Sequence, residues 1–329
     1  MPARFLIIQT AFIGDAILAT ALLEDLHRAW PDAQIDLLIR RGNEALFKGH
    51  PFINQLLIWE KRTEKYRSLW QLLHQIRATP YRAVLNLQRF GATGLLTALS
   101  GAKMTVGFDK NPFSAWFTHQ IPHVIGQHRH EVQRNNDLLK PLAIAGYSQS
   151  RPKLYPSPAD YSAVAHWQTE PYVCIAPTSV WFTKQFPANG WVKVIEQLPA
   201  HWRVYLLGAP GDTGACEYIR IETDRDRVIN LAGKLSLLES AALMQGARMN
   251  YVNDSAPLHL CSAMNAPTTA VFCSTVPGFG FGPLADNSRV AEIRDLIECR
   301  PCNLHGRKAC PLGHFRCATE IDIEDIVGT

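Results

Sequence analysis

The segment FLIIQTAFIGDAILATALLEDLHRAWPDAQIDLLIR (residues 5–40) displays the pattern on which the rest of the chain is built. Its apolar start predicts a buried strand over residues 5–10. Apolar residues then recur at helical spacing, which predicts a helix over residues 16–30. A Pro-Asp pair ends this helix, and residues 35–40 read as the next strand. A strand, a helix and a second strand in this order are typical of a parallel sheet covered by helices.

The same alternation continues along the chain and indicates two α/β domains. Residues 100–130 are less regular, and a Ser-, Pro- and charge-rich stretch at residues 148–160 reads as a linker or crossover. We therefore expect two doubly wound, Rossmann-like domains, residues 1–155 and 156–329, that face each other across a cleft at the carboxyl ends of their strands. The remaining predicted strands are 55–59, 83–87, 172–179, 203–210, 228–233, 249–254 and 268–275. The remaining predicted helices are 67–78, 131–146, 189–199, 236–247 and 256–265, with a further helical stretch between the strands 203–210 and 228–233 and a helix at the C-terminus.

Composition excludes several classes of protein. The 329 residues are 47% apolar and 19% charged and include 8 Trp, so each half can bury a core and the chain is not of the disordered class. There is no run of about 18 uncharged apolar residues, so we expect no transmembrane segment. The start lacks the features of a signal peptide, which predicts a cytoplasmic protein. A net charge of +4 suits an anionic ligand but is too weak to indicate nucleic acid.

The first candidate site lies where the first strand meets the first helix. Gly14 and Asp15 fall at this junction, and no GxGxxG dinucleotide motif accompanies them. Asp15 has two compatible interpretations. It is a helix N-cap, or it is a carboxylate at the mouth of the cleft that removes a proton from a hydroxyl.

A second candidate site lies in the segment NDSAPLHL (residues 253–260). Asp254 and Ser255 end a strand, and Ala256 and Pro257 begin a helix, whose unpaired first amides and positive dipole end suit a phosphate. His259 lies about one turn further along. A single His on a helix is more often a packed or surface residue, but its neighbours here favour a role in the site.

Two further strand ends carry polar residues. Thr178 and Ser179 close the first strand of the second domain, and Lys184 follows in an aromatic loop. A solvated surface residue is the ordinary reading of such a lysine, and neutralisation of a diphosphate is the functional one. Asp212 follows the next strand, in a turn that is ordinary by itself but could also accept hydroxyl groups of a ribose or sugar.

Four cysteines crowd into residues 299–317, which we call the cysteine-rich segment. Cys299, Cys302, Cys310 and Cys317 include one CxxC pair, with His305 and His314 among them. A structural zinc site, one or two local disulfides, and reduced thiols all remain possible. The other four cysteines lie in apolar segments and are expected in the core.

These motifs together resemble the ADP-heptose:lipopolysaccharide heptosyltransferases, the inverting GT-B glycosyltransferases of family 9. The resemblance covers nearly the whole chain. Its marks are IGDAILATALLEDL (13–26), NLAGKLSLLESAALM (230–244) and, most specifically, VNDSAPLHLCSAMNAPTTAVFCSTVPGFGFGPL (252–284). The cysteine-rich segment resembles that of the second-heptose branch of the family.

The resemblance implies roles for the candidate residues. Asp15 becomes the general base that deprotonates the acceptor hydroxyl. The donor, a nucleotide sugar such as ADP-heptose, would be bound by residues of the second domain. They are Thr178, Ser179, Lys184, Asp212, Asp254, Ser255, Ala256, Pro257 and His259.

The resemblance also implies an acceptor and a location. The acceptor would be an acidic, lipid-linked saccharide at the inner membrane surface, so the enzyme would be cytoplasmic and could be peripheral to that membrane. Gly14, Arg62, Lys65 and Arg89 are candidates for binding the acceptor, although generic surface charge explains the three cations nearly as well. The family needs no bound metal or other cofactor, so zinc held by the cysteine-rich segment would be structural.

The chain departs from the family pattern at a few positions, and two alternative functions stay open. The departures are Gln9, Ala256, Asn265, Cys273 and Ser274. They concern the identity and affinity of the donor more than the type of reaction. The alternatives are another GT-B enzyme that uses a different nucleotide sugar, as a transferase or an epimerase, and a two-lobed binding protein without catalysis.

Overall fold

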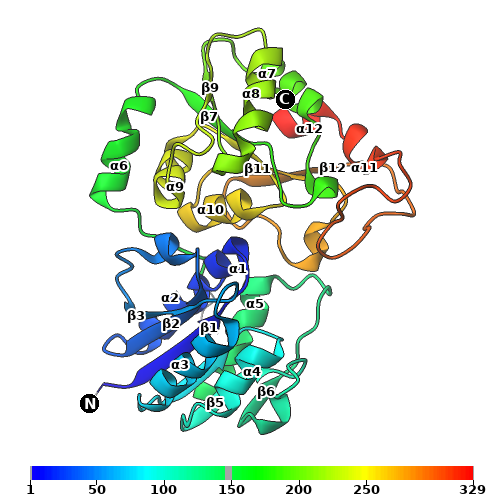
Figure 1. Ribbon diagram of the computed structural model, residues 1–329. Helices are drawn as coiled ribbons and strands as arrows, with labels where there is room; N and C mark the ends of the chain where they lie inside the picture. Colours follow the sequence, from blue (N-terminus) through cyan, green and yellow to red (C-terminus); the bar gives the residue numbers. More distant parts are fainter. Residues whose placement is uncertain (1, 145–149, 329) are drawn as a thin grey trace. The chain divides into compact units, whose positions relative to one another are not determined.

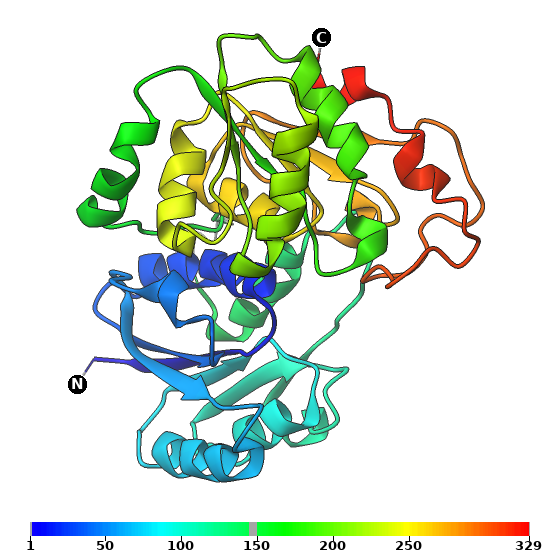
Figure 2. The same ribbon diagram turned by 45° about the horizontal axis from the view of Figure 1, so that its top comes forward.

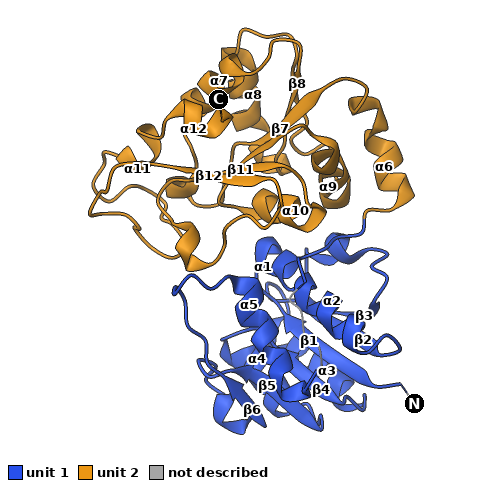
Figure 3. Ribbon diagram, turned by 180° about the vertical axis from the view of Figure 1, so that it is seen from behind, with its two compact units in different colours: residues 1–155 blue, residues 156–329 orange. Residues whose placement is uncertain are grey.

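The computed structural model describes residues 2–144 and 150–328, which form two compact units. Unit 1 comprises Met1–Tyr155 and unit 2 comprises Pro156–Thr329 (Figure 3). Each unit contains one six-stranded sheet in which all paired strands are parallel. The α/β prediction of two Rossmann-like domains is therefore confirmed at the level of the fold of each unit.

Unit 1 has the strand order β3-β2-β1-β4-β5-β6 (Figure 1). Helices α2 and α5 are neighbours, and so are α3 and α4. The strands are β1 (Arg4–Gln9), β2 (Gln34–Arg40), β3 (Ile53–Trp59), β4 (Ala83–Asn86), β5 (Met104–Phe108) and β6 (His119–Ile121). The helices are α1 (Ile13–Leu18), α2 (Thr20–Ala29), α3 (Lys65–Arg77), α4 (Gly91–Ala98) and α5 (Glu131–Asn136).

Unit 2 has the strand order β12-β11-β10-β7-β8-β9. Its helices α7 and α8 are neighbours, as are α9 and α10, and α9 is the yellow helix in Figure 2. The strands are β7 (Tyr172–Ala176), β8 (Arg203–Leu206), β9 (Val228–Asn230), β10 (Asn250–Asn253), β11 (Thr268–Phe272) and β12 (Ser288–Glu292). The helices are α6 (Pro158–Val164), α7 (Ala188–Gln197), α8 (Thr213–Glu222), α9 (Leu237–Gly246), α10 (Ala256–Met264), α11 (Arg316–Thr319) and α12 (Ile323–Val327).

The two strand orders are the same when each unit is numbered from its own first strand. In both, the chain builds outward from the first strand, then crosses over and places its fourth strand on the other side of the first. The topological switch points are therefore the pairs β1/β4 and β7/β10. Ligands of such sheets bind beyond the carboxyl ends of the strands at this point.

Apolar side chains on both faces hold each sheet between its helices. In unit 1, Leu69, Leu72 and Ile76 of α3 pack against Leu6 and Ile8 of β1 and their neighbours. In unit 2, the fully buried Trp191 of α7 anchors a cluster with Val173 and Ile175 of β7. Complete burial of one such side chain contributes about 1.5–3 kcal/mol to the stability of the fold. These clusters therefore fix the positions of the strands and of the residues at their ends.

Several predicted elements differ from the structure. The single helix expected over residues 16–30 is two helices, α1 and α2, which begin earlier, at Ile13. Residues 100–130 contain the strands β5 and β6, and β12 was missed entirely. These short strands were missed because they carry few apolar residues in a row. The helix predicted over 131–146 is α5 followed by a 3₁₀ helix to Leu142, and its last two positions lie outside the described residues.

The stretch predicted as a linker is more ordered than expected. Ser150 binds Asp25 of α2 through its backbone N–H (3.1 Å), and the N–H of Lys153 donates to Thr20 (2.8 Å). Ser157 then caps α6 in a reciprocal pair with Asp160. Positions 148 and 149 of this stretch lie outside the described residues.

Among residues 2–144 and 150–328, no helix has both the length and the apolar character to cross a membrane.

Candidate functional site

Asp15 lies in the first turn of α1, beyond the carboxyl end of β1. The N-cap of α1 is Phe12, so the expectation that Asp15 is the cap residue is wrong. Asp15 is the third residue of the helix, and its side chain is partly buried. The carboxylate sits near the positive end of the helix without being used as its cap.

The surroundings of Asp15 make its carboxyl group a stronger base than an ordinary aspartate. The pKa of Asp15 is raised from 3.8 to about 6, mainly by burial and to a lesser extent by the negative charge of Glu131. Backbone N–H groups and the cation of Arg89 act in the opposite direction. A carboxylate with a pKa near neutrality is suited to accept a proton from a substrate hydroxyl.

Glu131, whose negative charge raises the pKa of Asp15, is itself fixed in position by an ion pair. It begins α5, and its Oε2 accepts from Nη2 of Arg134 (2.7 Å) and from Nε of the same residue (2.8 Å). Arg134 is 1% exposed, so this ion pair is buried. The sequence analysis named neither residue, and the stretch EVQR gave no signal beyond that of a helix.

Cations surround the loop between β1 and α1. Arg40 ends β2 and stacks on the ring of Phe12, with its guanidinium carbon 4.7 Å from the ring centre. Burial lowers the pKa of Arg40, and the charge of Arg62 adds to this effect while that of Asp15 opposes it. Arg62 and Arg89, two of the predicted acceptor residues, are thus both in electrostatic contact with this region.

Lysine side chains extend the same positive region. Lys61 donates to the carbonyl oxygen of Thr10 (2.6 Å) in the β1–α1 loop. Burial lowers the pKa of Lys61 to about 8, and the charges of Arg40 and Lys65 add to this effect. Arg40 and Lys61 were missed by the sequence analysis. Their position directly after β2 and β3, which lie on one side of β1, is the signal that could have found them.

In unit 2, the site centres on an ion pair across the switch point. Nζ of Lys184, which follows β7, lies 2.8 Å from Oδ2 of Asp254, which follows β10. The hydroxyl of Thr275, beyond β11, donates to the same carboxylate oxygen (2.6 Å). The Lys184 and Asp254 side chains are only 15% and 6% exposed. The structure therefore brings these two predicted residues together and adds Thr275.

Asn253, the last residue of β10, holds the loop that carries Lys184. Its Nδ2 donates to the carbonyl of Pro177 (2.8 Å), and its Oδ1 accepts from the N–H of Phe186 (2.9 Å). One fully buried side chain thus ties both ends of the loop to the neighbouring strand. The sequence analysis missed Asn253, although a polar residue directly before Asp254 at a strand end was the available signal.

The start of α10 lies next to this ion pair. Ser255 occupies the N-cap position, yet its side chain makes no capping bond and its hydroxyl donates instead to the carbonyl of Asn253 (3.4 Å). Ala256 and Pro257 form the first turn, as predicted. The first amides of a helix have no partner within the helix, which is why such positions bind anions. His259 is 5% exposed and lies in the same helix.

The remaining predicted donor residues lie at the same edge of the sheet. Thr178 and Ser179 are half-buried in the loop after β7, and the carbonyl of Ser179 accepts from the side chain of Gln185 (2.6 Å). Asp212 lies in the turn after β8, where its carboxylate accepts from the N–H of Ala209 (2.7 Å). The carboxylate of Asp212 thus supports the turn, and its role toward a sugar stays a prediction.

The cysteine-rich segment holds four free thiols. The sulfur of Cys299 lies 3.8 Å from Nε2 of His314. Burial raises the pKa of Cys317 to about 11, and its nearby cysteines add to this effect, so the four thiols are neighbours. Across residues 2–144 and 150–328, however, no three His, Cys, Asp or Glu side chains are arranged to hold a metal ion. The structural zinc site stays a prediction.

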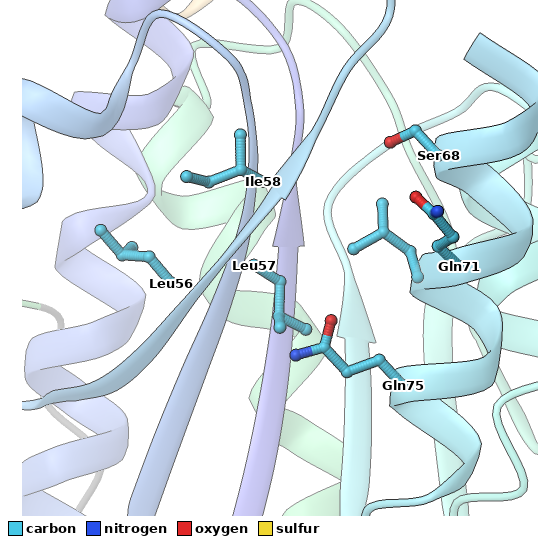
Figure 4. Close-up of a pocket in the computed structure, with 7 residues that line it drawn as sticks. Leu56, Leu57, Ile58, Ser68, Gln71 and Gln75 are labelled. Atoms are coloured by element: carbon cyan, nitrogen blue, oxygen red, sulfur yellow. The ribbon is translucent and has the colours of Figure 1, made fainter. Parts of the chain in front are cut away.

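Two hollows, one in each unit, lie away from these residues. Figure 4 shows one between β3 and α3, where Gln75 of the helix lies beside Leu57 of the strand. Another borders the beginnings of β7 and β11, at the opposite edge of the unit 2 sheet from Lys184. Neither is lined by a predicted site residue.

Comparison with known proteins adds independent evidence. The chain is 28% identical over 284 residues to lipopolysaccharide heptosyltransferase 3 of Escherichia coli, covering 80% of this chain and 82% of the relative. It is 26% identical over 307 residues to lipopolysaccharide heptosyltransferase 1 of Pseudomonas aeruginosa, covering 84% and 80%. The solved structure of E. coli ADP-heptose lipopolysaccharide heptosyltransferase II has the same GT-B fold, with a TM-score of 0.79 at 19% identity, covering 99% of this chain and 96% of the other.

A sequence model of the family described as Glycosyltransferase family 9 (heptosyltransferase) matches residues 69–310. This match spans most of the chain and both units, and it includes Lys184, Asp254 and the start of α10. The resemblance noted from the sequence is thereby confirmed: the chain is an enzyme that belongs to glycosyltransferase family 9, the heptosyltransferases.

Proposed function

We propose that this enzyme transfers a heptose from ADP-heptose to an inner-core acceptor of lipopolysaccharide, with inversion at the anomeric carbon. The relatives named above are lipopolysaccharide heptosyltransferases and support this choice of reaction. In the proposed step the acceptor oxygen forms a bond to the anomeric carbon as the bond to the diphosphate oxygen breaks. The proton of the acceptor hydroxyl passes to Asp15, and the leaving group departs as ADP.

Asp15 carries this proposal, because its raised pKa of about 6 suits a general base. At neutral pH the group is mostly ionised and can accept a proton, yet it is more basic than an exposed aspartate. General-base catalysis typically contributes about 10²–10⁴-fold to a rate. The rest of the acceleration must come from orientation of the two substrates and from stabilisation of the leaving group.

Unit 2 supplies the groups for the donor. The side chain of Lys184 is mostly buried and lies beside the start of α10, where the first backbone N–H groups have no partner within the helix. Both features favour the binding of a diphosphate. In the described structure Asp254 neutralises Lys184. When the donor binds, its phosphates would share this cation, and Thr178, Ser179, Ser255 and His259 are the proposed neighbours of the nucleotide sugar.

Unit 1 supplies cations for an acidic acceptor. Arg62, Lys65 and Arg89 were predicted for this role, and Arg40 and Lys61 join them around the loop that precedes Asp15. A lipid-linked acceptor also implies that the enzyme works in the cytoplasm at the surface of the inner membrane. We propose that no metal or other cofactor takes part in the reaction.

A panel of nucleotide sugars tests the identity of the donor. Calorimetric titration of the purified full-length protein with ADP-heptose, ADP-glucose, UDP-glucose and GDP-mannose should show tightest binding to ADP-heptose. Transfer to a heptose-deficient lipopolysaccharide acceptor should follow the same order. A preference for a UDP- or GDP-sugar would contradict the proposal and favour the alternative of a family enzyme with a different donor. Binding without any transfer would favour a non-catalytic protein, a reading that family membership argues against.

A further inference from the structure

The cysteine-rich segment contacts the loop that carries Lys184 at the two residues that directly precede it. It forms the orange-red loop at the edge of unit 2 in Figure 1. The N–H of Thr183 donates to the carbonyl of Arg307 (3.1 Å), and the N–H of Arg307 donates to Oγ1 of Thr183 (2.8 Å). The ring of Phe182 stacks on Phe315, with 5.1 Å between the ring centres. Two separate parts of the segment, around Arg307 and Phe315, therefore contact two consecutive residues of the loop.

Gly306 brings the backbone of the segment against the side chain of Lys184 itself. It is buried and has a φ of +82°, a conformation that favours glycine. A Cβ atom at this position would lie 2.8 Å from Cγ and 3.1 Å from Cδ of Lys184, and 3.0 Å from Cβ of Trp181. The backbone of Gly306 therefore packs directly against the methylene groups of the Lys184 side chain.

The same segment is fixed to the strand ends next to Asp254. The side chain of Arg300 is 11% exposed, and it donates to the carbonyls of Cys273 (2.7 Å) and Thr275 (2.8 Å). Thr275 in turn donates to Asp254, the partner of Lys184. Both members of the ion pair are therefore supported by residues 300–315.

We propose that the cysteine-rich segment orients Lys184 for the donor diphosphate, and that Gly306 is its main positioning residue. This inference rests on the proposed function, because it takes Lys184 as a diphosphate ligand. A lysine stem is flexible, and holding it in place before the ligand arrives reduces the cost of ordering it on binding. The segment thereby acts on the affinity for the donor without touching it.

A pair of glycine variants tests this role. Gly306→Ala should displace the Lys184 stem and weaken binding of ADP about fivefold or more, measured by calorimetry on the full-length protein. Gly313→Ala is the matched control: Gly313 lies in the same segment with a φ of +75°, but a Cβ there would meet nothing within 4 Å. Both variants carry left-handed backbone strain, which lowers thermal stability in each, and Gly306→Ala should lose more because its Cβ also displaces the Lys184 stem. ADP affinity should stay within about twofold of wild type only in Gly313→Ala.

The combination with Lys184→Ala separates this inference from the proposed function. If Gly306 acts through Lys184, the double variant should bind ADP no more weakly than Lys184→Ala alone. Additive losses, or a Gly306→Ala variant with wild-type affinity, would overturn the positioning role while leaving Lys184 as a ligand. If Lys184→Ala bound ADP with wild-type affinity, both the positioning role of Gly306 and the role of Lys184 as a diphosphate ligand would be overturned.

A second contact keeps the inference testable if Gly306→Ala does not fold. Phe182 is 48% exposed, so Phe182→Ala should fold while it loses the stacking on Phe315. We expect it to raise the KM for the nucleotide sugar about threefold or more with little change in kcat, and Phe182→Tyr should restore the wild-type KM. An unchanged KM in Phe182→Ala would count against the segment as a positioning element.

Discussion

The two units share one strand order but carry different chemistry at their switch points. In unit 1 the side chains that meet between β1 and β4 are the amides of Gln9 and Gln88, which hydrogen-bond to each other. In unit 2 the corresponding meeting between β7 and β10 is the ion pair of Lys184 and Asp254. The same strand order therefore supports a neutral side-chain contact in unit 1 and a charged one in unit 2. The few residues after each strand, rather than the strand order, determine what the edge can bind.

A second pair of equivalent positions sharpens this contrast. The fourth strand of each unit ends on a fully buried asparagine, Asn86 in β4 and Asn253 in β10. Oδ1 of Asn86 accepts from the backbone N–H of Gln88, two residues further along (2.9 Å). Asn253 instead reaches across to both ends of the Lys184 loop. Unit 2 thus uses this position to order a long loop, and unit 1 uses it to shape a short turn.

The largest expected effect comes from removing the carboxylate of unit 1. Asp15→Asn should lower kcat by about 10²–10⁴-fold, because the proposed base is lost. ADP affinity, for which we propose the groups of unit 2, should remain within about twofold of wild type by calorimetry. A variant with near-normal turnover would contradict the base role of Asp15, and a large loss of ADP affinity would contradict the separation of roles between the units.

The next effect should come from the cation of unit 2. Lys184→Ala should weaken ADP binding about 10- to 100-fold, because a hydrogen bond to a charged group contributes about 1.5–3 kcal/mol. Adenosine, which has no phosphates, should bind the variant and the wild type alike. If adenosine and ADP were affected equally, the loss would stem from a change in the fold of the loop rather than from a lost diphosphate contact.

The two asparagines should differ in their effect on stability. Asn253→Ala leaves the N–H of Phe186 and the carbonyl of Pro177 without this partner and should cost about 2–4 kcal/mol. Asn86→Ala loses the local hydrogen bond from the N–H of Gln88 and should cost about 1 kcal/mol. Hydrogen exchange in the sheet of each unit, followed by mass spectrometry, measures the two losses separately. Equal losses would show that the loop ties of Asn253 add nothing to the stability of unit 2.

The smallest predicted effect is a shift in the pH dependence of the reaction. Because the pKa of Asp15 is raised to about 6, kcat/KM should rise as pH increases through about 6 and level off above it. Glu131→Gln removes a charge that raises this pKa, so the rising limb should move to lower pH by up to about one unit. Arg89→Met removes a charge that lowers it, so the limb should move to higher pH. Shifts in the same direction would contradict the electrostatic account.

The fold was largely predictable because strand and helix periodicity is local information. The strands β1 and β7 contain continuous apolar runs and β2 contains one interrupted by Asp36, and each was found to within a few residues. Short or edge strands such as β6 and β12 were missed, since their burial depends on neighbours that are distant in the sequence. Tertiary pairing decides such elements.

The sites were predictable where a residue type itself signals chemistry. Asp15, Lys184 and Asp254 could be named because charged residues at strand ends are rarely needed for packing. Glu131 and Asn253 could not, since their roles depend on which elements the fold places beside them. Some departures from the family pattern also proved to be structural: Asn265 takes the left-handed C-cap of α10 (φ 52°), a position at which glycine is the usual residue.

The packing of residues 150–155 on α2 has a practical consequence for producing the two units separately. Ser150 and Lys153 are bonded to α2, and the hydroxyl of Tyr155 donates to Glu24 (2.7 Å). A separately expressed first unit that stops at position 144 would lack all three attachments and would expose the carboxylates of Asp25 and Glu24. A first unit that ends at position 155 keeps all three hydrogen bonds. Position 155 is therefore the boundary to use when each unit is produced alone.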